Sequence, residues 1–218
     1  MSLRIGFRLV SGLLTLALVA STAIGFDEPD RAAGNWPQWR GPDRTGISRE
    51  TGLLKSWPKE GPALLWKATG VGGGYSTPSL AGGRVFGMGY RGDDEIVWAL
   101  NATSGKELWS RRIAKANRGV GYGEGSRCTP TVDADRVYVV GVSGDFVCLA
   151  AANGKEVWHR NLVSDFGGGI PSWGYTESPL VDGDKVLATP GGNAATLVAL
   201  NKGNGEVIWK AQVPEGDG

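Results

Sequence analysis

An eleven-residue pattern that occurs three times is the feature that most constrains how this chain can fold. Each copy has Leu in the second place, a polar residue and then Gly in the sixth and seventh places, and Trp in the last, and the copies span residues 99–109, 148–158 and 199–209. Glycine adopts the positive φ of a tight turn without steric cost, and the flanking Leu, Val and Ile favour strands. Each copy therefore predicts a hairpin that ends on a tryptophan.

A second signal lies about 30 residues before each of these tryptophans. It is a hydroxyl residue followed by proline, and it occurs at Thr77-Pro78, Thr129-Pro130 and Ser178-Pro179. A strand, a turn and another strand are expected after each one. Four short strands in a period of about 50 residues are typical of a β-propeller blade. The sequence therefore predicts an all-β protein with blades at about 76–112, 127–162 and 176–213.

Residues 1–25 have the pattern of a secretory signal peptide. Arg4 and Arg8 precede or border an apolar run at residues 9–20, small residues follow, and no acidic residue is present. The run is too short to span a bilayer comfortably, which makes an uncleaved anchor the weaker alternative. Cleavage changes the formal net charge from +1 to −1, and neither value favours capture of nucleic acid or of an anionic membrane. We therefore expect an exported protein, periplasmic or extracellular, without a membrane span after cleavage.

Residues 26–62 are expected to form an extended segment, because they are rich in turn formers and show no strand alternation. We expect Trp36 and Trp39 to lie on the outside of a blade, with a role in binding as the alternative. Residues 63–67 resemble the last strand of a repeat, although no three strands precede them. Residues 63–218 are thus expected to form a partial propeller, an open arc of about three full blades plus this closing strand, and to be a fragment.

The repeated pattern resembles the tryptophan-docking motif of the pyrroloquinoline quinone (PQQ) type β-propellers, and Trp36-Pro37-Gln38-Trp39-Arg40-Gly41-Pro42 resembles secreted, planctomycete-type members. This superfamily includes quinoprotein alcohol dehydrogenases and non-catalytic outer-membrane assembly proteins of the BamB type. The resemblance implies that four tryptophans stack between neighbouring blades: Trp66, Trp109, Trp158 and Trp209. The motif departs from the family at Asn101 and Asn201, which replace Asp, and at Ala150, which cannot cap its turn.

Function in propellers usually lies on the loops that lead into the innermost strands, here residues 68–76, 113–127 and 163–176. If this loop face binds PQQ with Ca²⁺, as the resemblance allows, we expect Trp173 or Tyr175 to stack on the ring. Arg127 would then pair with a carboxylate or quinone oxygen, and Glu177 would be a cation ligand or a base. The alternative is a set of ordinary loops in which Arg127 and Glu177 are solvated or paired with each other.

Two functions stay open on the sequence alone. The first is a binding or scaffold module that holds a protein or glycan partner on the loop face, and the second is a PQQ-dependent dehydrogenase that oxidises an alcohol or polyol. Enzyme signals are few, since the single histidine, His159, lies beside a docking tryptophan and the acidic run 93–95 is expected to be a solvated turn. The adjacent-cysteine pair of many quinoprotein dehydrogenases is absent. We prefer the binding module, because a fold alone does not establish catalysis.

The two cysteines are expected on different strands of one blade. Cys128 is assigned to the first strand and Cys148 to the third, with one strand between them. Their separation should therefore be about twice the strand spacing of ~4.8 Å. This separation is too long for a disulfide, even though export favours one. The sequence therefore predicts two free thiols that behave as small buried hydrophobic groups.

Overall fold

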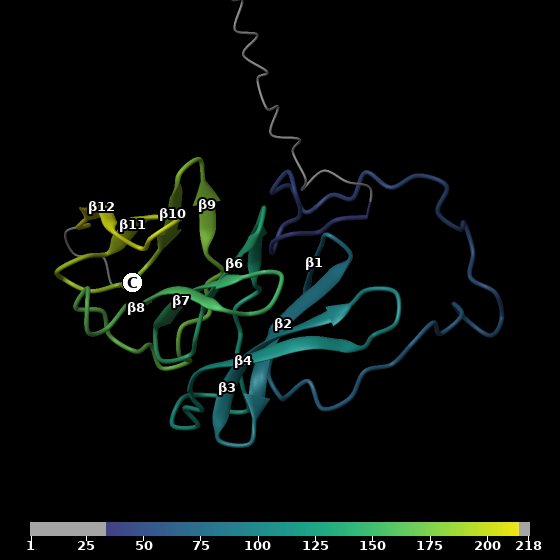
Figure 1. Cartoon of the computed structure of the whole chain (residues 1–218), viewed down its shortest axis with the longest axis horizontal. Coiled ribbons are helices and arrows are strands. Elements are labelled where there is room, and N and C mark those ends of the chain that lie inside the picture. The colour runs from purple at the N-terminus through teal and green to yellow at the C-terminus, as the bar shows by residue number, and fades with distance from the viewer. Residues whose placement is uncertain (1–33, 214–218) are drawn as a thin grey trace, which may run out of the picture.

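A computed structural model describes residues 34–213, so the expected signal peptide lies outside the described residues. Those residues form three four-stranded antiparallel sheets and no helix, which confirms the all-β arc of three blades (Figure 1). In each sheet the strands pair in the order in which they follow one another in the chain. Each blade is therefore a simple meander joined to the next by one loop. No helix within this part of the chain has the length and hydropathy needed to cross a membrane.

The strand boundaries agree closely with the repeats. The first sheet comprises β1 (Ser79–Ala81), β2 (Arg84–Arg91), β3 (Asp94–Asn101) and β4 (Glu107–Lys115). The second comprises β5 (Thr131–Asp133), β6 (Arg136–Val140), β7 (Asp145–Ala150) and β8 (Glu156–Asn161). The third comprises β9 (Leu180–Asp182), β10 (Lys185–Ala188), β11 (Leu197–Asn201) and β12 (Val207–Ala211). The first strand of each sheet is its innermost strand, and the fourth is its outermost.

The core of the molecule lies between the sheets. In β6, Val137 and Val139 belong to the apolar cluster shared with the first sheet, whereas Tyr138 and Val140 belong to the cluster shared with the third. This alternation follows from the two-residue period of a strand, which sends successive side chains to opposite faces. Both faces of the second sheet are buried in this way. Blade stability therefore depends on the neighbouring blade, as in other repeat architectures.

The two cysteines occupy opposite faces of the second sheet. Cys128 lies in the cluster between the first and second sheets, and Cys148 lies in the cluster between the second and third. Both are free and buried, which confirms the prediction, although Cys128 precedes β5 instead of lying on it. Burial raises the pKa of each thiol to about 12, so neither is a reactive thiolate near neutral pH.

The hydroxyl-proline signals join the inner ends of the blades. The Thr131 hydroxyl donates to the Pro179 carbonyl at 2.6 Å, and the Thr129 N–H donates to the Ser178 hydroxyl at 3.0 Å. Just before the pairs of the first two blades, the Ser76 hydroxyl donates to the Cys128 carbonyl at 2.6 Å and so links these blades. These bonds hold the three innermost strands side by side around one axis of the arc.

Three of the four expected docking tryptophans lie against the turn of the following blade. Their indole N–H groups donate to backbone carbonyls in that turn: Trp66 to Ala102 at 2.9 Å, Trp109 to Ala151 at 3.0 Å, and Trp158 to Lys202 at 3.0 Å. Each ring covers the turn glycine so closely that an added Cβ would lie within 2.8 Å of it. Trp209 has no following blade among the described residues and is 36% exposed.

The expected closing strand is wrong in one respect. Residues 63–67 place Trp66 on the first blade but form no strand in the structure. A strand requires a hydrogen-bonded neighbour, and none of the described strands lies beside this segment to provide one. Its side chains still cover the open face of the first sheet, because Trp66, Ala68 and Val71 pack on Trp98 and its neighbours.

The prediction that Trp36 and Trp39 lie on the outside of a blade is also wrong. Residues 36–44, which we call the strap, cross the inner edges of the sheets instead. Trp36 exchanges two backbone hydrogen bonds with Leu80 of β1, and Pro37 accepts one from Val132 of β5. The inner edges carry unpaired backbone groups, and an extended segment satisfies them better than the outer surface would.

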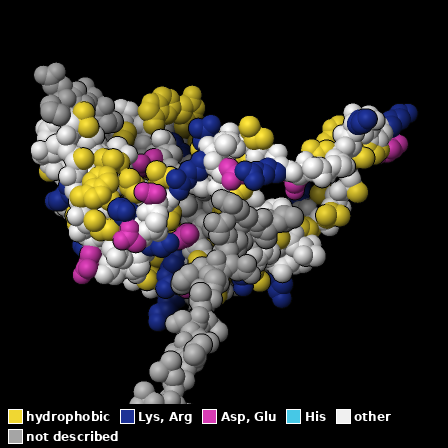
Figure 2. Space-filling model, turned by 90° about the horizontal axis from the view of Figure 1, so that it is seen from above, with side chains coloured by type: hydrophobic (Ala, Val, Ile, Leu, Met, Phe, Trp, Pro, Cys, Tyr) yellow, Lys and Arg dark blue, Asp and Glu magenta, His cyan; other side chains and the backbone are white. Residues whose placement is uncertain are grey.

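Beyond the strap, residues 47–65 leave the body of the molecule. Figure 2 shows this segment projecting to one side with hydrophobic and basic side chains along it. Its large apolar residues are all mostly exposed: Ile47, Leu53, Leu54, Trp57, Leu64 and Leu65. We call residues 47–65 the arm.

Candidate functional site

Three aromatic side chains meet on the loop face, one from each loop that leads into an innermost strand. The rings of Tyr75 and Tyr122 meet edge to face with centroids 6.1 Å apart, and those of Tyr122 and Trp173 stack at 4.9 Å. Each side chain is more than half exposed, and Tyr122 reaches 62%. We call these three residues the aromatic row. Such a contiguous exposed patch of large rings is typical of a binding surface.

Internal bonds hold the aromatic row in place. The Arg127 guanidinium donates to three carbonyls of the loop 121–125, including that of Tyr122, and lies 5.6 Å from the centre of the Tyr75 ring. The Tyr75 hydroxyl donates to Glu124 at 2.9 Å. Tyr122 has φ of 52°, a left-handed conformation that costs free energy for a residue with a side chain. The loop thus maintains a strained backbone to present an exposed ring, which indicates a function for that ring.

The four residues expected at the site differ in exposure and in hydrogen bonding. Trp173 is an open member of the aromatic row, whereas Tyr175 is buried and donates its hydroxyl to the Pro190 carbonyl at 3.0 Å. Tyr175 therefore cannot stack on a ligand. Glu177 accepts the Thr189 N–H at 2.7 Å, and burial raises the pKa of its carboxyl. Arg127 and Glu177 line the same groove, but no ion pair joins them.

A groove of about 890 Å³ lies beside the aromatic row, where the strap crosses the innermost strands. Its aromatic and charged lining comprises Trp39, Arg40, Arg44, Tyr75, Tyr122, Arg127 and Glu177. The remaining lining comes from the inner ends of the blades, including Thr77, Thr131 and Leu180. The volume suits a small ligand or a few residues of a peptide.

The residues expected around PQQ do not form a cradle for it. The donors of Arg127 are engaged by loop carbonyls, and Tyr175 is covered. A Ca²⁺ ion takes six to eight oxygen ligands, whereas Glu177 is the single carboxylate among the described residues that line the groove. Trp173 alone keeps the surface that ring stacking requires.

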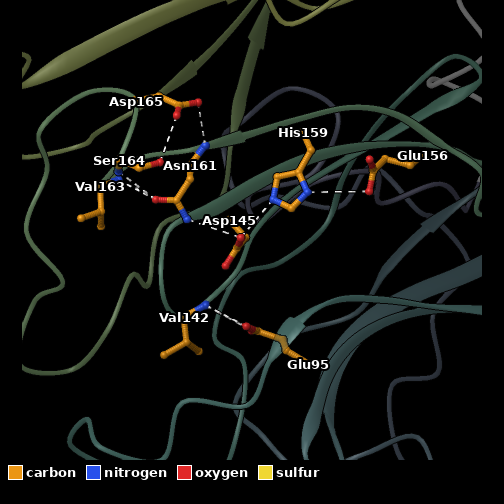
Figure 3. Close-up of polar contacts among 9 residues, drawn as sticks. All are labelled: Glu95, Val142, Asp145, Glu156, His159, Asn161, Val163, Ser164 and Asp165. Carbon is orange, nitrogen blue, oxygen red and sulfur yellow. Dashed lines mark hydrogen bonds and ion pairs between the residues drawn. The ribbon is translucent and has the colours of Figure 1, made fainter.

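Glu95 is a buried carboxylate that the sequence reasoning missed. The acidic run 93–95 was expected to be solvated, and this is wrong for Glu95, which is fully buried between the first two blades. It accepts a hydrogen bond from the Ser126 hydroxyl at 2.7 Å. It also accepts one from the Val142 N–H at 3.1 Å, which Figure 3 shows. Burial raises the pKa of its carboxyl to about 7. The alternation of β3 places Glu95 on the same face as Val97, which was the one local signal for its burial.

His159 lies in a separate polar cluster on β8 (Figure 3). Its Nε2 contacts Asp145 at 3.0 Å and its Nδ1 faces Glu156 at 3.7 Å, and the Asp145 hydrogen bond raises the pKa of the imidazole. The nearby Ser164 hydroxyl donates to Asp165 and not to the histidine. This arrangement is a histidine hydrogen-bonded to a carboxylate, and it lacks the serine-to-histidine bond of a nucleophilic triad.

Comparison with solved structures finds the same fold. The quinohemoprotein alcohol dehydrogenase from Comamonas testosteroni shares 24% identity with a TM-score of 0.65, covering 82% of this chain and 27% of that one. A europium-containing methanol dehydrogenase shares 19% identity with a TM-score of 0.65, covering 84% of this chain and 33% of that one. At these identities the likeness shows the fold alone. The chain spans about a third or less of the length of these proteins.

Comparison with sequence families identifies one match. No curated protein sequence matches the chain significantly. The model of the family described as outer membrane protein assembly factor BamB matches residues 41–127 and 93–217, which together cover most of the chain. The three meander blades and their regular tryptophan turns agree with this match. The chain therefore belongs to the BamB family of PQQ-like repeat β-propellers.

Proposed function

We propose that this chain is an exported, non-catalytic binding module that holds a protein or glycan partner on its loop face. The observation that carries the proposal is the aromatic row, three large rings that stay exposed while internal bonds hold them rigid. Rigid aromatic side chains supply much of the binding free energy at protein interfaces, because little entropy is lost when they are covered. Membership of the BamB family supports a protein partner.

The charged groups on the loop face support binding more than catalysis. Arg127 donates to carbonyls of its own loop, and Glu177 accepts a hydrogen bond from the Thr189 N–H. Neither is held toward a reacting atom by a second acid or base in the described part of the chain. The described residues of the loop face offer the dehydrogenase alternative no support comparable to that which the aromatic row gives the binding module.

The proposal is tested by placing a photo-crosslinking phenylalanine derivative at Tyr122 in the full chain, produced in a cell that exports it. A matched control places the same derivative at Arg112 on the outermost strand of the first blade. We expect a discrete crosslinked protein, or saturable binding on a glycan array, that depends on Tyr122 and is lost in Trp173→Ala. The Arg112 control, which keeps the aromatic row, should give no crosslink and should retain any glycan binding.

A parallel titration with PQQ and Ca²⁺ follows dye-linked alcohol oxidation and tryptophan fluorescence. No saturable binding and no turnover are expected. PQQ-dependent turnover, or the absence of any partner at Tyr122, would overturn the proposed function.

A further inference from the structure

The strap shows that the inner edges of the blades accept an extended peptide backbone. Trp36 donates to the Leu80 carbonyl at 2.7 Å and accepts the Leu80 N–H at 2.9 Å, and Pro37 accepts the Val132 N–H at 2.8 Å. Leu80 and Val132 occupy the same place in their blades, since each is the middle residue of its innermost strand. One stretch of chain thus adds to the inner edges of two consecutive blades.

Among residues 34–213, no such backbone partner pairs with the third blade. Its equivalent residue is Val181, the middle residue of β9, and its carbonyl accepts only the guanidinium of Arg44. The strap does not continue along β9, because its chain reverses in a turn at residues 40–46. The Gly46 N–H closes this turn by donating to the Arg40 carbonyl at 2.9 Å. No backbone hydrogen bond joins the strap to β9 among the described residues. The groove lies at this unpaired edge, lined by Pro179 and Leu180.

Positive charge dominates the groove. Arg40, Arg44 and Arg127 line it, and Glu177 is the single acidic residue in its described lining. The Glu177 carboxyl already accepts the Thr189 N–H at 2.7 Å. The Arg40 guanidinium has no hydrogen bond or ion pair with any described residue. Its charge therefore remains available to a ligand.

The turn that carries Arg40 is rigid. Gly41 has φ of 76°, and an added Cβ would lie 2.9 Å from the Trp36 ring, so the ring packs directly on the glycine. Trp39, next to Arg40, is 60% exposed at the rim of the groove. The strap thus presents an aromatic ring and a free guanidinium together beside an open strand edge.

We infer that this groove binds an extended acidic peptide from a partner protein, added as a strand to the inner edge of β9. Carboxylates of the peptide meet Arg40, the peptide backbone replaces the Arg44 guanidinium at the Val181 carbonyl, and an apolar side chain covers Trp39. Strand addition supplies main-chain hydrogen bonds, and arginine recognises carboxylates through two parallel N–H donors. The inference rests on the proposed function, because it names the chemistry of the protein partner and a second contact surface for it.

The test uses calorimetric titration of the full chain with a capped peptide in which valine alternates with glutamate. Alternation places every carboxylate on one side of the added strand. The matched probe replaces each glutamate with glutamine, and free glutamate serves as the anion control. Arg40→Gln is the test variant, and Lys106→Gln, which removes the same charge from an exposed turn between β3 and β4, is the control variant.

We expect saturable binding of the acidic peptide, about tenfold weaker in Arg40→Gln and unchanged in Lys106→Gln. The glutamine peptide and free glutamate should bind much more weakly than the acidic peptide. Equal binding of the two peptides, equal affinity in wild type and Arg40→Gln, or no peptide binding would overturn the inference. A Tyr122-dependent crosslink that persists in such a case would leave the proposed function standing, whereas loss of both would remove both.

Discussion

Glu95 shows how far the surroundings of one residue can depart from those of its neighbour in the sequence. Asp94 is a half-buried partner of Arg112 and Lys115, whereas Glu95 is enclosed between two blades with Ser126 and Val142 as hydrogen-bond donors. Burial disfavours the charged carboxylate more than these two bonds favour it, so the pKa is raised.

Glu95→Gln should change how stability depends on pH. The pKa of the Glu95 carboxyl is about 7 in the folded chain against an ordinary value of 4.5, so the folded state binds the proton more tightly than the unfolded state. The resulting stabilisation is complete below pH 4.5 and is lost as the pH rises through 7. Glutamine resembles the protonated form and does not titrate. We therefore expect the variant to gain up to about 3 kcal/mol relative to wild type between pH 5 and pH 8.

Urea unfolding at several pH values measures this difference. Glu60→Gln, an exposed substitution in the arm, is the control and should follow the wild-type curve. A wild type and a Glu95→Gln variant whose unfolding free energies change in parallel with pH would contradict the prediction.

Ala150→Asn should stabilise the second blade. In the first and third blades the equivalent Asn101 and Asn201 each accept two backbone N–H groups of the turn through Oδ1. The backbone of all three turns is alike, since the turn glycine donates to the first residue of the turn at 2.8 Å in each. Asparagine at position 150 can therefore cap the turn without rearrangement, and we expect a gain of about 0.5–1.5 kcal/mol in unfolding free energy. Asn101→Ala should lose a similar amount in the same urea experiment, and a destabilised Ala150→Asn would show that the turn differs.

At the scale of the element, the tryptophan at the end of each outer strand couples one blade to the next. Trp158 is buried against Gly205 and donates to Lys202, whereas Trp209 holds the same place in its own blade with no neighbour described. Trp158→Ala should therefore cost about 3–5 kcal/mol of unfolding free energy. Trp209→Ala, the matched substitution, should cost less than about 1 kcal/mol. Similar losses for both variants in urea unfolding would mean that the contact with the next blade contributes little.

At the scale of the whole molecule, and within the described part of the chain, the arm stands apart from the packed blades, because its large apolar side chains are exposed. Its backbone forms no strand, and its large apolar side chains are exposed, so local opening there breaks little structure. Brief treatment of the native chain with trypsin should therefore cut first after Lys55 and Lys59. Mass spectrometry of the products identifies the sites. First cuts within the loop 113–127, which carries Arg118 and Arg127, would show that the loop face opens more readily than the arm.

Features that depend on local pattern could be predicted from the residues alone. Strand positions follow from hydrophobic alternation, the turns follow from glycine at residues such as Gly154, and the separation of Cys128 from Cys148 follows from strand order. These properties arise within one repeat, so they are visible in a single stretch of residues.

Contacts between distant segments, by contrast, depend on how the blades pack and could not be predicted from one stretch of residues. The strap crosses the inner edges because unpaired backbone groups of the first two blades lie there, and Glu95 is buried because Val142, in the next blade, closes over it. Arg127 serves its own loop, and Tyr175 is covered by the third blade, although both residues stood where a ligand was expected. The packing of the blades determines which groups are buried and which hydrogen-bond partners they have. The spacing of residues within one repeat does not predict these contacts between blades.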